Sequence, residues 1–358
     1  MSSTSKTKSR QSNVELLRLV VMGMIVLHHF IFHGLGVYRN LAFGEDPLMN
    51  ADDTRWALIT DSFLICGVNV FVLISGWFSI KFNAGSFVRL FAMCSFYAVV
   101  VYLIYLVTND IDWEIGIFLR IIKRGFCVVS SKTWWFIQLY FLLMFLSKPI
   151  NKYVEVATKK SLLYTIGTFL FINVYLGWMR GIEFVKDGYN LFNFIMLYLI
   201  GRYLRLYWNN NYSIKRDIII YIISSFLTAV LVVSLYEKHF STYMALCYNS
   251  PFIITAAVSL FLCFVKLNFH SNLVNYFAGS SLAIYLIQEV GYNFYDNIKA
   301  MYINEVPIFH FGLMVLLFFF LSMLVPIAID KLRLLIFVRL EEKASNVLDE
   351  RAFQKFVE

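Results

Sequence analysis

One apolar segment near the N-terminus carries an unusual set of ionisable side chains. Residues 14–33 are mostly Leu, Val, Ile, Met and Phe, interrupted by Glu15, Arg18, His28, His29 and His33. Ionisable groups are costly inside hydrocarbon and by default mark a functional pathway. Imidazole moves protons near neutral pH, and guanidinium pairs with phosphate in a bidentate fork. The segment therefore predicts proton transfer at a histidine and anion recognition at Arg18.

Helical geometry aligns these groups. Arg18 and His29 are eleven positions apart, which at about 100° per residue leaves them only about 20° off one face of a helix. Glu15 and His33 fall on the same stripe, at spacings of three and four. His29 would lie about 16 Å beyond Arg18 along the helix axis. We therefore expect Arg18 at the membrane boundary and His29 near the middle of the membrane.

Two other interpretations of the stripe remain open. The histidines could satisfy each other or a backbone carbonyl within a polar core. His29 and His33 also have the spacing of a helix-borne metal-ligand pair. No third carboxylate or thiolate ligand accompanies them at a useful spacing, so we predict no metal site.

The composition indicates a membrane protein. Of the 358 residues, 59% are apolar and only 15% are charged, whereas soluble domains have about 45–50% and about 25%. The net charge of +8 comes from short basic stretches between apolar runs, which are typical of topology signals and not of a nucleic-acid surface. The five cysteines show no CxxC spacing and are predicted to be small core residues.

The apolar runs predict an all-α, polytopic membrane helical bundle of about ten spans. They lie at 15–36, 57–79, 87–107, 134–150, 161–178, 190–208, 217–236, 251–267, 278–298 and 308–330. The run at 134–150 is short, and that at 278–298 contains Glu289. The basic stretch 111–131 is predicted to be an interfacial or re-entrant helix.

The charge distribution predicts the orientation. Most lysines and arginines fall on the same side as the N-terminus, which we therefore place in the cytoplasm. We expect a cytoplasmic tail at 1–13, a transmembrane domain at 14–330 and a second cytoplasmic tail at 331–358, in a multi-pass protein of the cell (plasma or inner) membrane. The loop after the first span is predicted to be acidic; its carboxylates are Glu45, Asp46, Asp52, Asp53 and Asp61.

An arginine, ten residues and a histidine in the first span resemble the acyltransferase 3 family of integral-membrane O-acyltransferases. Four further segments are similar to family patterns and occur in the same order. They are Phe71–Trp77 (FVLISGW), Trp134-Trp135-Phe136 followed by Tyr140 and Pro149, Tyr198–Tyr203 (YLIGRY) and Ser280–Ile287 (SSLAIYLI). The resemblance extends over roughly residues 14–330.

The resemblance implies transfer of an acyl group, acetyl in preference to a longer chain, from acetyl-CoA to a hydroxyl of a cell-surface or lipid-linked glycan. The donor is then a substrate, and no permanently bound cofactor is expected. We assign His29 as general base, with His28 or His33 as the alternative. Arg18, Lys81 and Arg89 are predicted to form a basic mouth for CoA, although ordinary positive-inside anchoring would also explain Lys81 and Arg89.

Weaker assignments complete the predicted substrate site: Glu15, Ser75, Trp134, Trp135 and Gln288. Ser75 could instead serve helix packing, and the tryptophans could belong to an interfacial belt. Gln288 stands where many relatives have histidine, so we predict a hydrogen bond to substrate there. Arg89 stands where the family often has two arginines three positions apart.

The main competing hypothesis is a transporter or flippase for a saccharide or a lipid-linked saccharide. Against it, the sequence has no paired repeats with broken helices, and only 5 prolines and 17 glycines. A non-catalytic sensor or assembly factor would not need the Arg–His stripe. We therefore favour the acyltransferase.

Overall fold

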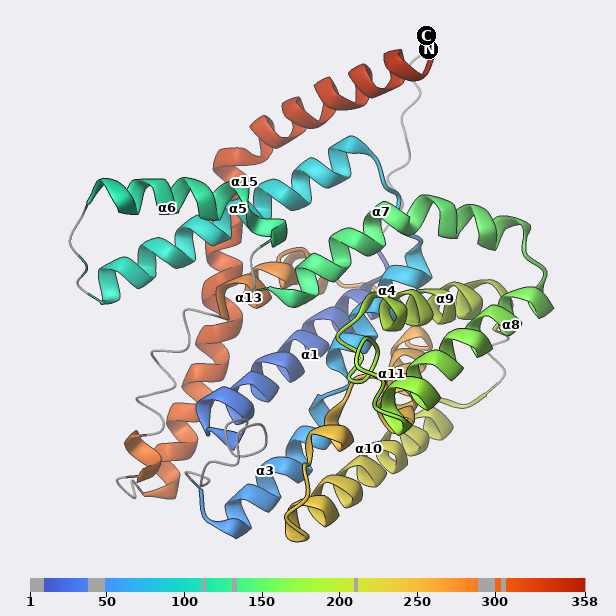
Figure 1. Ribbon diagram of the computed structural model, residues 1–358. Coiled ribbons are helices and arrows are strands. Elements are labelled where there is room, and N and C mark those ends of the chain that lie inside the picture. Colours follow the sequence, from blue (N-terminus) through green and yellow to red (C-terminus); the bar gives the residue numbers. More distant parts are fainter. Residues whose placement is uncertain are drawn as a thin grey trace.

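The computed structural model describes residues 10–37, 49–109, 111, 114–130, 134–208, 212–288, 300–303 and 307–357. These residues form helices and connecting loops, and no strand occurs among them (Figure 1). In chain order the elements are α1 (Ser12–His29), η1 (Phe30–Gly34), α3 (Ala51–Leu64), α4 (Gly67–Phe78), α5 (Ala84–Thr108), α6 (Ile115–Phe126), η2 (Val128–Ser130), α7 (Trp135–Val156), α8 (Lys159–Leu170), η3 (Phe171–Met179), α9 (Leu191–Tyr207), α10 (Ile214–Glu237), η4 (Tyr243–Leu246), α11 (Pro251–Val265), α12 (Asn272–Ala278), α13 (Ser281–Ile287) and α15 (Ile308–Val357).

The all-α, multi-pass architecture is confirmed, but the predicted count of ten spans is too high. Within the described residues, 7 segments are long and apolar enough to cross a membrane. The predicted spans at 134–150, 190–208 and 278–298 are not among them. α7 carries lysines in its second half, and α9 has only 17 residues and includes two arginines. α13 ends at Ile287, and residues 289–298 of the third predicted span lie outside the described part.

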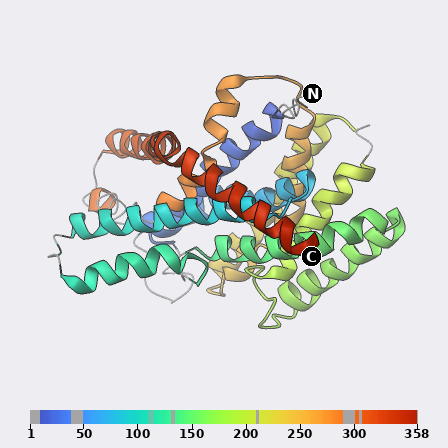
Figure 2. The same cartoon turned by 90° about the horizontal axis from the view of Figure 1, so that it is seen from above.

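The basic segment 111–131 contains a short helix and does not add a span. α6 has 12 residues, of which only Ile117 is buried. It lies beside α5 in both views (Figures 1 and 2). Arg124 of α6 stacks over the Tyr102 ring of α5, 4.4 Å from its centroid. This arrangement leaves an apolar face of α6 exposed, as expected for an interfacial helix.

α1 lies at the centre of the bundle. It packs against α3, α4, α11, α12, α13 and α15, and Leu17, Val21 and Val26 are buried on it. Directly after His29 the helix widens into the π-helical turn η1. Such π-helical turns are rare and frequently lie at functional sites. Because six helices pack against α1, the helix that carries the Arg–His stripe is enclosed on nearly every side.

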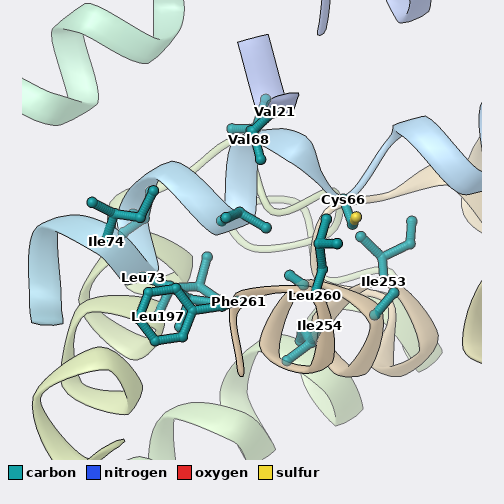
Figure 3. Close-up of a cluster of buried hydrophobic side chains, with 14 of the residues drawn as sticks. Val21, Cys66, Val68, Leu73, Ile74, Leu197, Ile253, Ile254, Leu260 and Phe261 are labelled. Carbon is teal, nitrogen blue, oxygen red and sulfur yellow. The ribbon is translucent and has the colours of Figure 1, made fainter. Parts of the chain in front are cut away.

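The main core joins α4, α9 and α11 to α1. Figure 3 shows apolar side chains of this core, which include Cys66, Leu73, Leu197, Ile254 and Phe261. Four of the five cysteines are buried, as predicted, whereas Cys127 is exposed.

α4 and α9 touch backbone to backbone. A Cβ added at Gly76 would lie 2.2 Å from the Tyr198 carbonyl oxygen, and one at Gly201 would lie 2.4 Å from the Leu73 carbonyl oxygen. These two glycines belong to the FVLISGW and YLIGRY segments. Small residues allow such close approach between helices in membranes. The two sequence segments are therefore the two halves of one helix contact.

The start of α1 and the middle of α15 lie at the same end of the bundle. Arg10 donates a hydrogen bond to the Asn275 carbonyl (2.9 Å), and Lys331 donates one to the neighbouring Tyr276 carbonyl (2.7 Å). α15 continues to Val357 without a break, so the predicted boundary at 330/331 is not a break in secondary structure.

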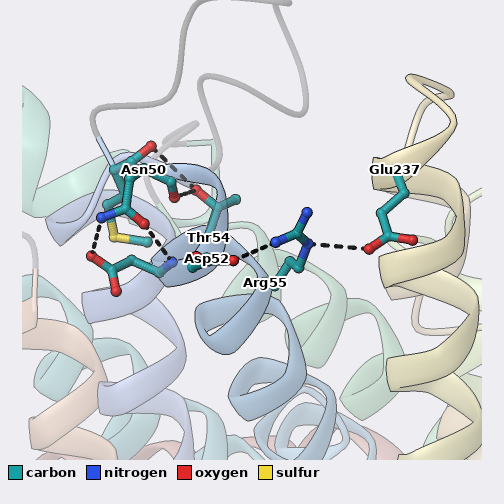
Figure 4. Close-up of polar contacts among 7 residues, drawn as sticks. Asn50, Asp52, Thr54, Arg55 and Glu237 are labelled. Atoms are coloured by element: carbon teal, nitrogen blue, oxygen red, sulfur yellow. Dashed lines mark hydrogen bonds and ion pairs between the residues drawn. The ribbon is translucent and has the colours of Figure 1, made fainter.

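The opposite end of the bundle holds the predicted acidic segment, most of which is helical. Asn50 caps α3, accepting a hydrogen bond from the Asp53 amide (2.8 Å), and Arg55 joins Asp52 to Glu237 of α10 (Figure 4). Glu45 and Asp46 lie outside the described residues. Asp52, Asp53 and Asp61, all assigned to the loop in the sequence analysis, lie in α3. Asp61, which the predicted run 57–79 also includes, is fully buried.

Candidate active site

One cavity surrounds Arg18 near the start of α1. Its volume is about 300 Å³, and it is lined by Arg18, Ser75, Phe78, Ser79, Ile80, Lys81, Ser86, Leu90, Tyr140 and Met144. Lys81 enters this wall because the chain turns sharply after α4, with Ser79 at a φ of 62°. Ser75 and Tyr140 bring hydroxyl groups to this cavity, and the Ser75 hydroxyl donates a hydrogen bond to the Phe71 carbonyl (3.0 Å). The cavity thus combines two cationic side chains with hydroxyl groups, which suits an anionic ligand.

Glu15 positions Arg18 from one helical turn away. Its carboxylate lies 3.5 Å from the guanidinium, and its side chain is almost buried. The guanidinium also lies 5.8 Å from the centroid of the Phe78 ring. Glu15 does not line the cavity. It is a positioning residue for Arg18 in this arrangement.

A second cavity surrounds the three histidines. Its volume is about 390 Å³, and it is lined by His28, His29, Phe32, His33, Ile65, Trp135, Asp187, Tyr189, Tyr243, Leu246 and Tyr248. The π-helical turn η1 carries Phe32 and His33 to this wall. Along the axis of α1, His29 is about 16 Å from Arg18. A single helix therefore contributes to both cavities.

The two adjacent histidines have different partners. The His29 Nδ1–H donates to the Gln288 side-chain oxygen at the end of α13. That contact leaves Nε2 of His29 as the basic nitrogen. The His28 Nδ1 lies 2.6 Å from the Asp61 carboxylate. One imidazole is thus paired with a neutral amide and the other with a carboxylate.

Three aromatic rings form another wall of the histidine cavity. The Trp135 ring lies 4.3 Å from the Tyr189 ring and 5.6 Å from the Tyr248 ring, measured between centroids. Asp187 accepts hydrogen bonds from the Tyr189 amide (3.0 Å) and the Tyr243 hydroxyl (3.3 Å). Burial, together with the neighbouring Tyr248, raises the pKa of the Tyr189 hydroxyl well above its ordinary value, so this group stays a neutral hydrogen-bond donor.

The structure brings most predicted site residues to one cavity or the other. Arg18, Ser75 and Lys81 line the first cavity. His28, His29 and Trp135 line the second, and Gln288 contacts it through His29.

Besides Glu15, two predicted site residues do not reach these walls. Arg89 is exposed on α5 and lines neither cavity. Trp134 is buried in a cluster with Tyr97 and Phe141, away from the aromatic wall. Glu289, noted in the sequence, lies outside the described residues.

Sequence reasoning missed Asp61, Asp187, Tyr189 and Tyr248. Asp61 lies within the predicted apolar run 57–79 and could have been identified as an intramembrane carboxylate. Asp187, Tyr189 and Tyr248 come from connecting segments. Nothing in their spacing indicates that they meet Trp135, because only the packing of the helices brings those loops together.

Comparisons with known proteins identify the family. A family model described as an acyltransferase domain matches residues 11–331. Searches of curated proteins and of solved structures returned no significant match. The family match extends from the start of α1 to the middle of α15 and includes both cavities. This chain therefore belongs to the acyltransferase 3 family of membrane acyltransferases.

Proposed function

We propose that this membrane acyltransferase moves an acyl group, acetyl in preference to a longer chain, from acyl-CoA to a hydroxyl of a cell-surface or lipid-linked glycan. The observation that carries the proposal is the pair of cavities along α1, one at Arg18 and one at His29. Arg18 would bind the donor, and His29 would activate the acceptor.

The Arg18 cavity suits the anionic part of CoA. Arg18 and Lys81 offer two cations at the basic end of the bundle, where Arg10 and Lys331 also lie. A guanidinium holds phosphate in a bidentate fork. We take this end to be cytoplasmic, by the positive-inside rule. The pantetheine arm is of the order of the ~16 Å that separates Arg18 from His29, so the thioester could reach the imidazole while the nucleotide stays at the mouth.

The histidine cavity suits a sugar acceptor. The rings of Trp135, Tyr189 and Tyr248 offer apolar faces to a sugar ring, and the Asp187 carboxylate accepts hydrogen bonds from hydroxyls. His29 Nε2 would remove the proton of the attacking hydroxyl. In this mechanism the acyl group crosses the membrane and CoA does not.

The direct test uses the purified full-length protein in proteoliposomes. Acetyl-CoA labelled in the acetyl group is supplied on one side and a lipid-linked oligosaccharide in the bilayer. We expect free CoA thiol and labelled saccharide to appear in equal amounts. Translocation of unmodified saccharide without thiol release would contradict this proposal and support the flippase.

Arg18→Ala should raise the KM for acetyl-CoA by about tenfold to a hundredfold, because a charge-assisted phosphate contact of about 1.5–3 kcal/mol is lost. Arg18→Lys should recover only part of the affinity, because lysine keeps the positive charge but cannot make the bidentate contact of a guanidinium with phosphate. The measurement is initial rate against acetyl-CoA concentration. Lys160→Ala, which removes an exposed cation of α8, serves as the control. Equal KM values in Arg18→Ala and wild type would place the nucleotide elsewhere.

Trp135→Ala should raise the KM for the saccharide at least tenfold while leaving the KM for acetyl-CoA within about twofold, because stacking is lost only at the acceptor. Two substrate titrations on the same preparation separate the effects. Trp56→Ala, which removes an exposed tryptophan of α3, is the matched control. A change confined to acetyl-CoA affinity would count against an acceptor site at the aromatic wall.

A further inference from the structure

His28 and Asp61 form a second ionisable pair beside His29 that general-base catalysis alone does not use. The His28 Nδ1 and the Asp61 Oδ1 are 2.6 Å apart. The Asp61 side chain is fully buried, and its second oxygen has no hydrogen-bond partner in the described part of the chain. A carboxylate removed from water requires a cation beside it. His28 is the group placed to supply that charge.

We propose that Asp61 holds His28 as an imidazolium whose Nε2–H donates a hydrogen bond to the oxyanion formed during acyl transfer. Because Nδ1 is engaged by Asp61, Nε2 is the ring nitrogen left for the cavity that His28 lines. The ring centroids of His28 and His29 are 5.5 Å apart. His28 is then an electrostatic catalytic residue, and Asp61 is its positioning residue.

The partners of the two histidines explain why adjacent imidazoles would hold different charges. The Gln288 amide oxygen brings no charge to His29, whereas the Asp61 carboxylate brings a negative charge to His28 and so favours the imidazolium there more strongly. When the environments of two titratable groups favour different charges in this way, the neutral group can act as the base and the charged group as the electrostatic stabiliser. Among the described residues, the other ionisable side chains lining this cavity are His33, Asp187, Tyr189, Tyr243 and Tyr248.

The acyl-transfer step needs no further reactant. The role of His28 in it rests on the proposed function. The acceptor hydroxyl gives its proton to His29 Nε2 as its oxygen bonds to the thioester carbon. The carbonyl oxygen takes the electron pair and accepts the hydrogen bond from His28 Nε2–H. Collapse breaks the carbon–sulfur bond, and the CoA thiolate takes the proton from His29. His28 keeps its proton throughout.

Asp61→Asn tests this assignment, because it preserves the shape and removes the charge. At pH 8 we expect kcat to fall by about a hundredfold, with the KM for acetyl-CoA unchanged. The split between kcat and KM separates this role from misfolding, which would lower the yield of folded protein and leave kcat per folded molecule near the wild-type value. An unchanged kcat, or a loss that appears in the KM for acetyl-CoA and not in kcat, would overturn the proposal.

Asp217→Asn is the matched control. Asp217 is also a fully buried carboxylate, paired with Lys266 and Arg216, and it lines neither cavity. Its loss should lower stability but leave kcat per folded molecule within twofold.

A second measurement does not depend on activity. In wild-type protein labelled with ¹⁵N-histidine, the His28 signal should have the imidazolium pattern at pH 8, with His28→Gln identifying the signal. A neutral His28 would overturn the charge assignment even if acyl transfer is confirmed. If the wild-type protein transfers no acyl group, the proposed function fails and the oxyanion role with it, and the spectrum still decides the charge of His28.

Discussion

His29→Ala is expected to lower kcat for acyl transfer by about a thousandfold, within the range of about 10²–10⁴ that a positioned general base contributes. The residue lines the cavity, and its Nδ1–H is held by Gln288, so that Nε2 is directed to proton transfer. The KM for acetyl-CoA should stay within about twofold, because Arg18 is about 16 Å away along the helix. Initial rates of CoA thiol release against acetyl-CoA concentration give both constants.

His270→Ala is the matched control, since it removes an exposed histidine that lines neither cavity. His29→Gln tests whether shape alone suffices, and it should be as inactive as His29→Ala because an amide is not a base at neutral pH. A kcat within about fivefold of wild type in His29→Ala would assign the base to another group.

Gly76→Ala is expected to prevent stable folding. The new Cβ would lie 2.2 Å from the Tyr198 carbonyl oxygen and 2.9 Å from its carbonyl carbon. Both atoms are backbone, so α4 and α9 must separate and the core around Leu73 and Leu197 must open. Overpacking in cores typically costs about 1–3 kcal/mol and more where backbone must move. We expect little monodisperse protein in detergent, or a thermal midpoint lowered by more than about 10 °C.

Gly167→Ala makes the same chemical change without the clash. Nothing lies within 4 Å of a Cβ at this position, which is in the second half of α8. Alanine is favoured over glycine inside a helix by about 0.5–1 kcal/mol, so this variant should be as stable as wild type or slightly more stable. Equal behaviour of the two variants would refute the close α4–α9 contact.

The contact between Gly76 and Gly201 also shows what a sequence pattern can and cannot reveal. In the sequence the FVLISGW and YLIGRY segments are two separate resemblances, and each alone is an apolar string with one glycine. Their structural role is evident only once α4 and α9 pack, because a glycine allows close approach only where another backbone lies opposite it.

Hydropathy predicted the membrane class and all 7 of the segments that qualify as spans, because lipid exposure demands long apolar helices whatever the packing. It overcounted at 134–150 and 190–208, where apolar residues serve contacts between helices. α9, for example, buries Phe194, Met196 and Leu197 in the main core. Hydropathy alone does not distinguish a residue that faces lipid from one that faces a neighbouring helix.

The sequence by itself determined the spacing of Arg18 and His29, because both lie on one helix and the period of about 3.6 residues per turn fixes their common face. Only the tertiary structure decided their surroundings. Gln288 reaches His29 from 259 positions away, Asp61 reaches His28 from 33 positions away, and Tyr248 meets Trp135 across the cavity. Local geometry follows from the chain's own period, whereas the partners that set charge and specificity depend on which helices the burial of apolar surface brings together.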